Sequence, residues 1–186
     1  DEVYDRIIYE GKHISFLGTD YEKILLINSF SKTFAMTGWR IGYVLSPNLL
    51  AMEQIVKLQY YLVACSNDGM QYAVLSAFEH ASDYPEQMAL EFKERRDLIC
   101  ERLNNMPNVS CHVPKGAFYV FPKVTIEGMN SEELALELLK GGVLCSPGSA
   151  FGDSGEGHLR FAYTISKQDI SRGMDKVEAV LNKLTT

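Results

Sequence analysis

Two short apolar runs, residues 23–28 and 41–45, most constrain how this chain can fold. A strand with one face in water alternates apolar and polar residues, whereas these runs show no alternation and are rich in residues that favour strands. We therefore expect each run to form a strand that is covered on both faces. Longer segments with helical spacing follow, so the chain should be a globular α/β protein.

Several segments repeat apolar residues at helical spacing. Pro47 is expected at the first helical position of one of them, and Pro85 opens another, because a helix tolerates proline in its first turn. Asn130 and Glu133 predict a capping box, and Gly141 ends that helix. The expected helices cover residues 47–63, 70–78, 85–103, 131–140 and 170–184.

The second half of the chain also contains strand candidates. Residues 109–113 and 117–121 flank a turn and predict a β-hairpin or a meander. Residues 143–145 and 158–163 are further candidates. We interpret the charged residues 93–97, within the long third helix, as a solvated surface.

Composition excludes several classes of protein. The 186 residues are 46% hydrophobic and 23% charged, which is typical of a chain that buries a core, and a net charge of −6 argues against binding to nucleic acid or to an anionic membrane. The four cysteines are widely spaced, so neither a metal site nor a disulfide framework is predicted. No apolar run is long enough to span a membrane. We expect a cytoplasmic protein with reduced thiols.

Lys32 lies in a segment whose residue types suit covalent chemistry beside a phosphate. A lysine amine is a poor nucleophile at neutral pH unless its site is desolvated or electropositive, and Arg40 could supply the positive field. Ser29 and Arg40 also offer the hydroxyl and guanidinium donors that bind a phosphate dianion. The alternative for the same stretch is a strand, a turn and a second strand, with an exposed lysine in the turn.

The whole run of residues 29–42 resembles the lysine signature of the class I/II aminotransferases of the aspartate aminotransferase superfamily, which use pyridoxal 5′-phosphate. The resemblance implies that Lys32 forms the aldimine with this cofactor. It also implies that Ser29 and Arg40 bind the phosphate.

Asp1 and Tyr4 precede this run as the corresponding residues do in that family. The resemblance implies that Asp1 pairs with the pyridinium nitrogen, which keeps the ring protonated and a stronger electron sink, and that Tyr4 contacts O3′. Gly38 and Gly42 are expected to let the backbone turn tightly. Taken alone, an acidic residue and a loop tyrosine would be surface residues.

Near the other end of the chain, residues 146–152 and 157–161 resemble the segment with which the same family holds its substrate. Arg160 matches the arginine that binds the α-carboxylate of the amino acid. A planar guanidinium suits this role because it binds a carboxylate through two parallel hydrogen bonds. Without the resemblance, Arg160 would be interpreted as an edge-strand arginine paired to a surface acid.

The resemblance also predicts the architecture. Residues 1–90 would be the C-terminal part of the large cofactor-binding domain, a mixed sheet with helices, and residues 91–186 a smaller α+β domain. The chain opens at Asp1 without an initiator methionine, so we expect a fragment that is inactive alone and self-associates. The complete protein would be a homodimer that moves an amino group between an amino acid and a 2-oxo acid, with no metal.

Three alternatives stay open at this point. A lyase or synthase of the same fold would use the same lysine, aspartate and arginine, since other residues decide the fate of the substrate. An aminotransferase-like domain could instead sense a ligand in a regulatory protein, which an upstream DNA-binding motif without turnover would indicate. The residues could also form a folded fragment without catalysis.

Overall fold

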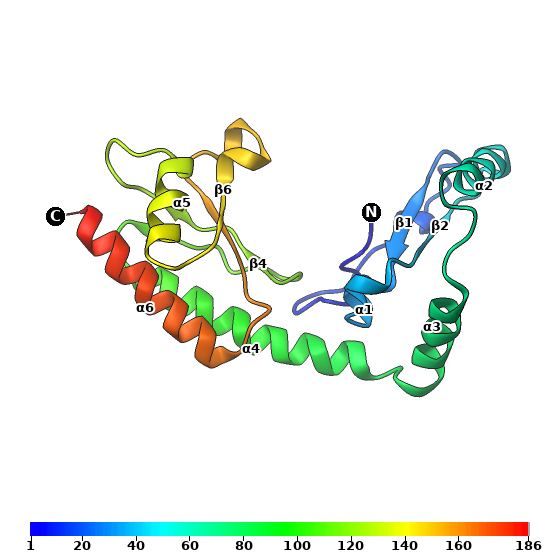
Figure 1. The fold of residues 1–186 in the computed structure, drawn as a ribbon, viewed down its shortest axis with the longest axis horizontal. Coiled ribbons are helices and arrows are strands. Elements are labelled where there is room, and N and C mark those ends of the chain that lie inside the picture. The colour runs from blue at the N-terminus through cyan, green and yellow to red at the C-terminus, as the bar shows by residue number, and fades with distance from the viewer. Residues whose placement is uncertain (186) are drawn as a thin grey trace. The chain divides into compact units, whose positions relative to one another are not determined.

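The structure, a computed structural model, describes residues 1–185. Two strands, β1 (Leu26–Ser29) and β2 (Gly42–Leu45), pair antiparallel in the first part of the chain, with Ser29 opposite Gly42. The turn between them contains the one-turn helix α1 (Phe30–Thr33) and a short 3-10 helix, η2 (Thr37–Trp39). Figure 1 shows the pair with α1 directly below β1.

The expectation that both strands are covered on both faces is wrong for the described residues. Leu26 and Asn28 of β1 are buried, but Ile27 between them is 52% exposed, and Leu45 of β2 is 46% exposed. β1 and β2 form a two-stranded sheet with no further strand beside them in residues 1–185. One face of this pair therefore has no covering layer.

Two helices follow, α2 (Leu49–Val63) and α3 (Asp68–His80). Both predicted helices are confirmed, but Pro47 does not occupy the first helical position: Asn48 is the N-cap of α2, and its side-chain oxygen accepts a hydrogen bond from the Ala51 N–H at 3.0 Å. An asparagine cap satisfies a free N–H of the first turn, which proline cannot do. Proline therefore precedes the cap.

The long helix α4 (Tyr84–Asn104) contains the boundary between two compact units, Asp1–Ala89 and the unit that begins at Leu90. The core of the first unit contains Ile7, Leu26, Phe34, Ile41 and Val74. α2 contributes no buried residue to it.

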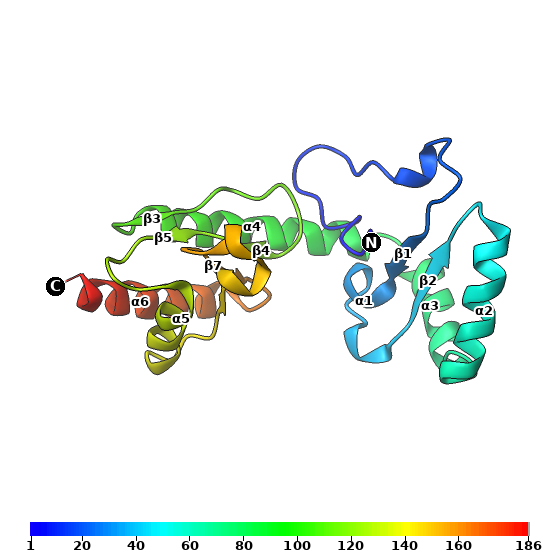
Figure 2. The same cartoon turned by 90° about the horizontal axis from the view of Figure 1, so that it is seen from above.

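In the second unit, α4 and the closing helix α6 (Lys167–Leu184) lie side by side, as the two views of Figures 1 and 2 agree. They run parallel, because Glu94 pairs with Lys167 and, further along both helices, Arg102 pairs with Asp175 at 2.6 Å. The core packs here around Leu103, Leu138, Leu159, Tyr163 and Val177, all at most 1% exposed.

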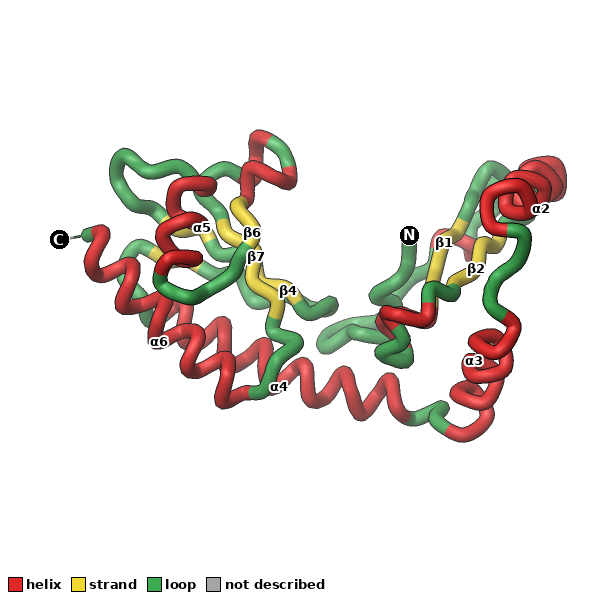
Figure 3. The backbone as a smooth tube through the Cα atoms, in the orientation of Figure 1, coloured by secondary structure: helices red, strands yellow, loops and turns green. Residues whose placement is uncertain are grey.

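The strands of the second unit pair differently from the expected hairpin. β3 (Val109–Ser110) pairs with β5 (Lys123–Val124), whereas β4 (Tyr119–Val120) and β6 (Ser146–Pro147) flank β7 (Leu159–Ala162) in a three-stranded antiparallel sheet. Figure 3 shows β4, β6 and β7 next to one another. A hairpin between residues 109–113 and 117–121 is therefore wrong, and no strand covers residues 143–145.

α5 (Ser131–Lys140) begins with the predicted capping box, in which Asn130 and Glu133 exchange side-chain and backbone hydrogen bonds. The charged run in α4 is not entirely solvated, because Arg96 is only 3% exposed and donates to the Pro114 carbonyl at 2.9 Å. A loop carbonyl and the adjacent Asp97 carboxylate satisfy this buried guanidinium. None of the helices in residues 1–185 is long and apolar enough to cross a membrane.

Candidate active site

Lys32 lies on the single turn of α1, directly after β1. Ser29 serves both elements: its backbone is extended, as a strand requires, and its hydroxyl accepts a hydrogen bond from the Ser31 N–H at 3.3 Å, which caps the turn. The turn closes with the Phe34 N–H donating to the Phe30 carbonyl at 3.1 Å. Lys32 is half-buried in this setting.

Arg40 adopts a left-handed backbone conformation, with φ +53° and ψ +50°, at the end of η2. Such a conformation costs an arginine about 1–2 kcal/mol, and residues of this kind cluster at functional sites. Its guanidinium donates to the Thr37 carbonyl at 2.8 Å. Among residues 1–185, no carboxylate lies within ion-pair distance of it, so its charge stays available.

Ser29 and Arg40 line the same cavity, which has a volume of about 540 Å³. Its polar walls also include Asn28, Ser31 and the backbone of Gly42, and residues of β2 and α2 provide its apolar side. The structure thus brings the two predicted phosphate-binding residues together. Lys32 follows Ser31 in the chain but does not line the cavity, nor do Asp1 and Tyr4.

Gly42 fits tightly between the two strands. A Cβ added there would lie 2.6 Å from the Asn28 carbonyl oxygen and 3.1 Å from the Ser29 Cβ. Glycine is therefore needed for close approach rather than for a tight turn. At Gly38 an added Cβ would meet nothing within 4 Å and φ is not positive, so the geometry does not require glycine there.

Asp1 and Tyr4 lie in the segment that runs beside β1. The Glu2 N–H donates to the Ile27 carbonyl at 2.9 Å, which holds this segment against the strand. Asp1 is exposed, and its carboxylate accepts a hydrogen bond from the Val3 N–H at 3.1 Å. Tyr4 is half-buried, and its carbonyl accepts from the Ile7 N–H.

Glu2 anchors the loop that follows. Its carboxylate accepts from Ser15 Oγ at 3.0 Å and the Phe16 N–H at 3.2 Å, and contacts His13 Nε2 at 2.9 Å. Burial opposes ionisation of this carboxylate, but the hydrogen bonds from His13, Phe16 and Ser15 outweigh it and lower the pKa of Glu2. The sequence pattern gave no reason to single out this residue.

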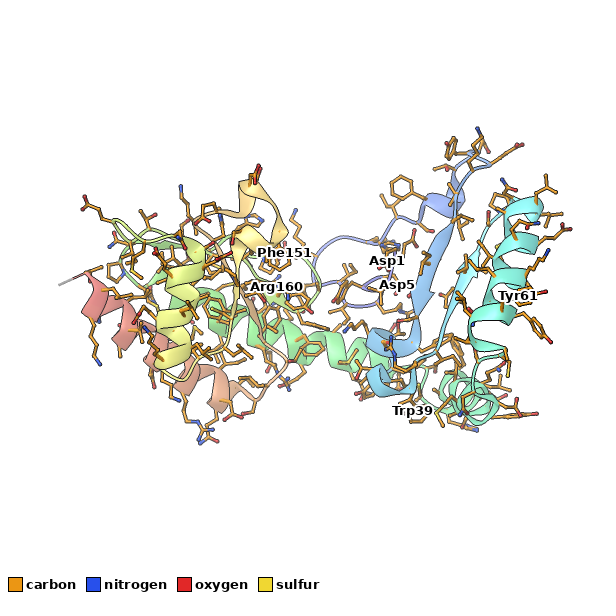
Figure 4. The ribbon with its side chains drawn as sticks, turned by 45° about the horizontal axis from the view of Figure 1, so that its top comes forward. Asp1, Asp5, Trp39, Tyr61, Phe151 and Arg160 are labelled. Atoms are coloured by element: carbon orange, nitrogen blue, oxygen red, sulfur yellow. The ribbon has the colours of Figure 1, made fainter. Side chains whose placement is uncertain are left out.

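Sequence reasoning also missed Asp5, which is labelled with Asp1 in Figure 4 and follows it by four residues. Its Oδ1 is buried and has no hydrogen-bond partner among the described residues. The pKa of the Tyr43 hydroxyl is raised, first by burial and second by the negative charge of Asp5. A hydrogen bond with Asn28 lowers this pKa but does not cancel the increase. No motif in the sequence points to this group.

Arg160 lies on β7 in the second unit and pairs in register with Ser146 of β6. It is half-buried, and its Nη2 donates to Ser146 Oγ at 3.3 Å. Its Cζ lies 4.6 Å from the ring centre of Tyr119 and 4.5 Å from that of Phe151. In the described part of the chain, no carboxylate pairs with this guanidinium.

These side chains form two separate sets of hydrogen-bond donors that can bind anions. Ser29 and Arg40 form one set in the first unit, and Arg160 with Ser146 forms another in the second. Residues 1–185 contain no cluster of three or more His, Cys, Asp or Glu side chains that could hold a metal ion. Guanidinium and hydroxyl groups are donors that suit phosphate and carboxylate oxygens.

Comparison with known proteins identifies the family. The family model described as "Aminotransferase class I and II" matches residues 1–177. The chain is 40% identical to an aspartate aminotransferase of Pyrococcus horikoshii over 97% of its own length and 47% of that protein's. It is 39% identical to aromatic-amino-acid aminotransferase 2 of Thermococcus litoralis, covering 98% of this chain and 48% of the relative.

The solved structures that resemble this chain are also aminotransferases. The aromatic aminotransferase from P. horikoshii superimposes with a TM-score of 0.92 at 39% identity, covering 98% of this chain and 50% of that one. An aspartate aminotransferase of Thermus thermophilus described with maleate gives a TM-score of 0.88 at 29% identity, over 96% of this chain and 46% of that one. The chain spans about half the length of the curated relatives it matches. The chain belongs to the class I and II aminotransferases, a family whose members use pyridoxal phosphate in general.

Proposed function

We propose that the complete protein transfers an amino group between an amino acid and a 2-oxo acid, with pyridoxal 5′-phosphate as cofactor and Lys32 as the residue that bonds to it. The observation that carries this proposal is the cavity shared by Ser29 and Arg40, next to the turn that holds Lys32, in a chain of this family. The relatives compared above are named aminotransferases, which supports transfer over a lyase or a ligand sensor.

Three observations support the fit of the phosphate. Arg40 has a charge that no described carboxylate neutralises, and it is held in an unusual backbone conformation by the turn. Ser29 supplies a hydroxyl from the same cavity wall. Gly42 also lines the cavity, and its close approach to Asn28 and Ser29 keeps β2, which follows Arg40, against the strand that ends at Ser29.

Asp1 and Tyr4 would serve the ring of the cofactor in this proposal. Asp1 has an exposed carboxylate in the segment that Glu2 holds beside β1, the strand that leads into the Lys32 turn. A carboxylate on the pyridinium nitrogen favours its protonated form. Tyr4, half-buried in the same segment, would donate to O3′.

When bound, pyridoxal phosphate supplies a conjugated ring that takes up the electron pair left as the substrate Cα loses its proton. The substrate amine would displace Lys32 Nζ from the cofactor, and the freed amine would accept the Cα proton as a base and then, as an acid, donate it to C4′ of the cofactor. Arg160 orients the substrate by binding its α-carboxylate through two parallel hydrogen bonds.

The proposal also includes the setting of the site. Residues 1–90 would be the C-terminal part of the large cofactor-binding domain, residues 91–186 the small domain, and the protein a homodimer in the cytoplasm. The exposed apolar side chains of α2, among them Leu50 and Tyr61, support a protein partner. The four free cysteines, including Cys100 and Cys111 with sulfurs 3.9 Å apart, support a reducing compartment.

Transfer is tested in the complete protein by following nitrogen from a ¹⁵N-labelled amino acid into the amino acid formed from an unlabelled 2-oxo acid. We expect ¹⁵N in the product, and its loss in Lys32→Ala. Lys12→Ala, which removes an exposed lysine from a loop of the same unit, is the matched control and should transfer nitrogen normally. Normal transfer by Lys32→Ala would overturn the proposal.

A further inference from the structure

The guanidinium of Arg160 lies against two aromatic rings. Tyr119 lies on one neighbour of β7 and Phe151 at the end of η3 (Gly148–Phe151), and both ring centres are within 4.6 Å of Arg160 Cζ. Figure 4 shows Phe151 beside Arg160. Cation–π attraction operates to about 6 Å from a ring centre, so both rings interact with this cation.

The Phe151 ring is held in turn by a second layer of ring contacts. Phe121 packs edge-on against Phe151, with ring centres 5.8 Å apart and planes at 89°. Phe121 also stacks on His158, with ring centres 4.9 Å apart and an angle of 9° between the ring planes. These contacts restrain a side chain that is 50% exposed and would otherwise be free to rotate.

The loop that carries Phe151 is also fixed through its backbone. A Cβ added at Gly148 would lie 1.9 Å from the Gly155 carbonyl oxygen, and a Cβ added at Gly155 would lie 2.1 Å from that of Gly148. Two backbone segments therefore touch here, which only glycine permits. Tyr119 is fixed differently, by the pairing of β4 with β7 opposite Ala162.

A guanidinium carries five N–H donors, and those without a protein acceptor can bind a ligand. Ser146 Oγ accepts one of them at 3.3 Å, and no described carboxylate accepts the others. A planar carboxylate bonds a guanidinium through two parallel hydrogen bonds in a shared plane. An arginine whose plane is already fixed loses less freedom when it binds, which strengthens binding.

We propose that Tyr119 and Phe151 are positioning residues that lock the plane of the Arg160 guanidinium for an incoming carboxylate. This inference rests on the proposed role of Arg160 as the carboxylate ligand. Each ring should contribute about two- to fivefold to carboxylate affinity, the range expected for a partly exposed cation–π contact.

The test uses NMR of the Arg160 side chain in the complete protein, with pyruvate as the probe and its neutral amide, pyruvamide, as the chemical control. The variants are Phe151→Leu and Tyr119→Leu, which remove a ring, and Phe151→Tyr and Tyr119→Phe, which keep one. Phe16→Leu, which removes an exposed ring from the first unit, is the matched control. Guanidinium rotation and the dissociation constant for pyruvate are measured for each.

We expect the Arg160 guanidinium to rotate slowly in the parent protein. Loss of either ring should make this rotation faster and weaken pyruvate binding two- to fivefold. The variants that keep a ring should recover both properties. Unchanged rotation and affinity in both leucine variants would overturn the inference while leaving Arg160 as the carboxylate ligand. If pyruvate and pyruvamide shift Arg160 equally in the parent protein, the carboxylate role itself fails. The rotation measurement then still decides whether the rings position the guanidinium.

Discussion

Single residues in the β1–β2 pair determine whether the predicted phosphate donors meet. Gly42 lies opposite Ser29 in the strand register, and the close approach of its Cα to the Asn28 carbonyl leaves no room for a side chain. Arg40 comes two residues earlier, so the same register fixes its distance from Ser29. The proposed phosphate site therefore depends on a residue without a side chain.

Gly42→Ala should destabilise the first unit by about 1–3 kcal/mol, because a methyl group 2.6 Å from a carbonyl oxygen forces the strands apart. Trp39, the only tryptophan in the sequence, reports on this unit by fluorescence during urea unfolding. Gly38→Ala is the matched control and should change stability by less than about 0.5 kcal/mol. Equal effects of the two substitutions would contradict the close approach.

Cys145 offers a test of burial through pH. Burial raises its pKa to about 11, from an ordinary value of 9.0, so the reactive thiolate forms only at higher pH. At pH 8 its thiolate fraction should be about a hundredfold lower than that of an unperturbed thiol. Alkylation followed by mass spectrometry should modify the exposed Cys65 first, with Cys145 labelling rising as the pH approaches 11. Equal rates at pH 8 would contradict this environment.

That Ser29 and Arg40 lie near each other could be predicted because they are close in the sequence. Ser29, Lys32 and Arg40 belong to one short segment, and local geometry places two of them in one cavity. The rings around Arg160 could not be predicted, because Tyr119 and Phe151 reach it only through strand pairing and loop packing. Asp5 has no signal in the sequence, since its burial depends on tertiary structure.

At the scale of elements, helices were predicted more successfully than strand partners. Helix ends depend on local signals such as the capping box at Asn130 and Glu133, and these signals were confirmed. Strand partners depend on contacts far apart in the chain: β4 pairs with β7, some forty residues later, rather than with the nearby residues 109–113. Arg96 shows the same limit, because a charged run does not reveal which member is buried.

Asn130→Ala should destabilise the second unit by about 1 kcal/mol, because it removes the acceptor for the Glu132 and Glu133 N–H groups at 3.0 and 2.9 Å. Amide hydrogen exchange should show the loss in the first turn of α5. Asn105→Ala, after the end of α4, removes an amide with no side-chain hydrogen bond in the described structure and should leave exchange in α5 unchanged. Undiminished protection in Asn130→Ala would contradict the role of the cap.

At the scale of the whole molecule, the first unit exposes many large apolar side chains. α2 has no buried residue, and Leu49, Leu50 and Tyr61 are each at least 74% exposed. Surfaces of this kind normally mark contacts with other protein. The chain also matches only about half the length of its relatives.

We predict that the isolated chain self-associates through α2, with a sedimentation coefficient that rises with concentration. Leu50→Glu and Tyr61→Glu should shift the equilibrium toward monomer, because each places a charge in an apolar contact. Leu136→Glu on α5, at a leucine that is 56% exposed in the second unit, is the control and should leave association unchanged. A parent chain that stays monomeric at every concentration would contradict this prediction.

The central claim is that Lys32 bonds to pyridoxal phosphate beside the Ser29 and Arg40 donors. It is tested most directly by incubating the complete protein with the cofactor, reducing with borohydride to fix any lysine that has bonded to it, and locating the modified lysine by mass spectrometry. We expect modification to concentrate at Lys32 and to fall when Arg40→Gln removes the phosphate donor. Modification spread evenly over exposed lysines such as Lys12, with no preference for Lys32 and no effect of Arg40→Gln, would contradict the claim.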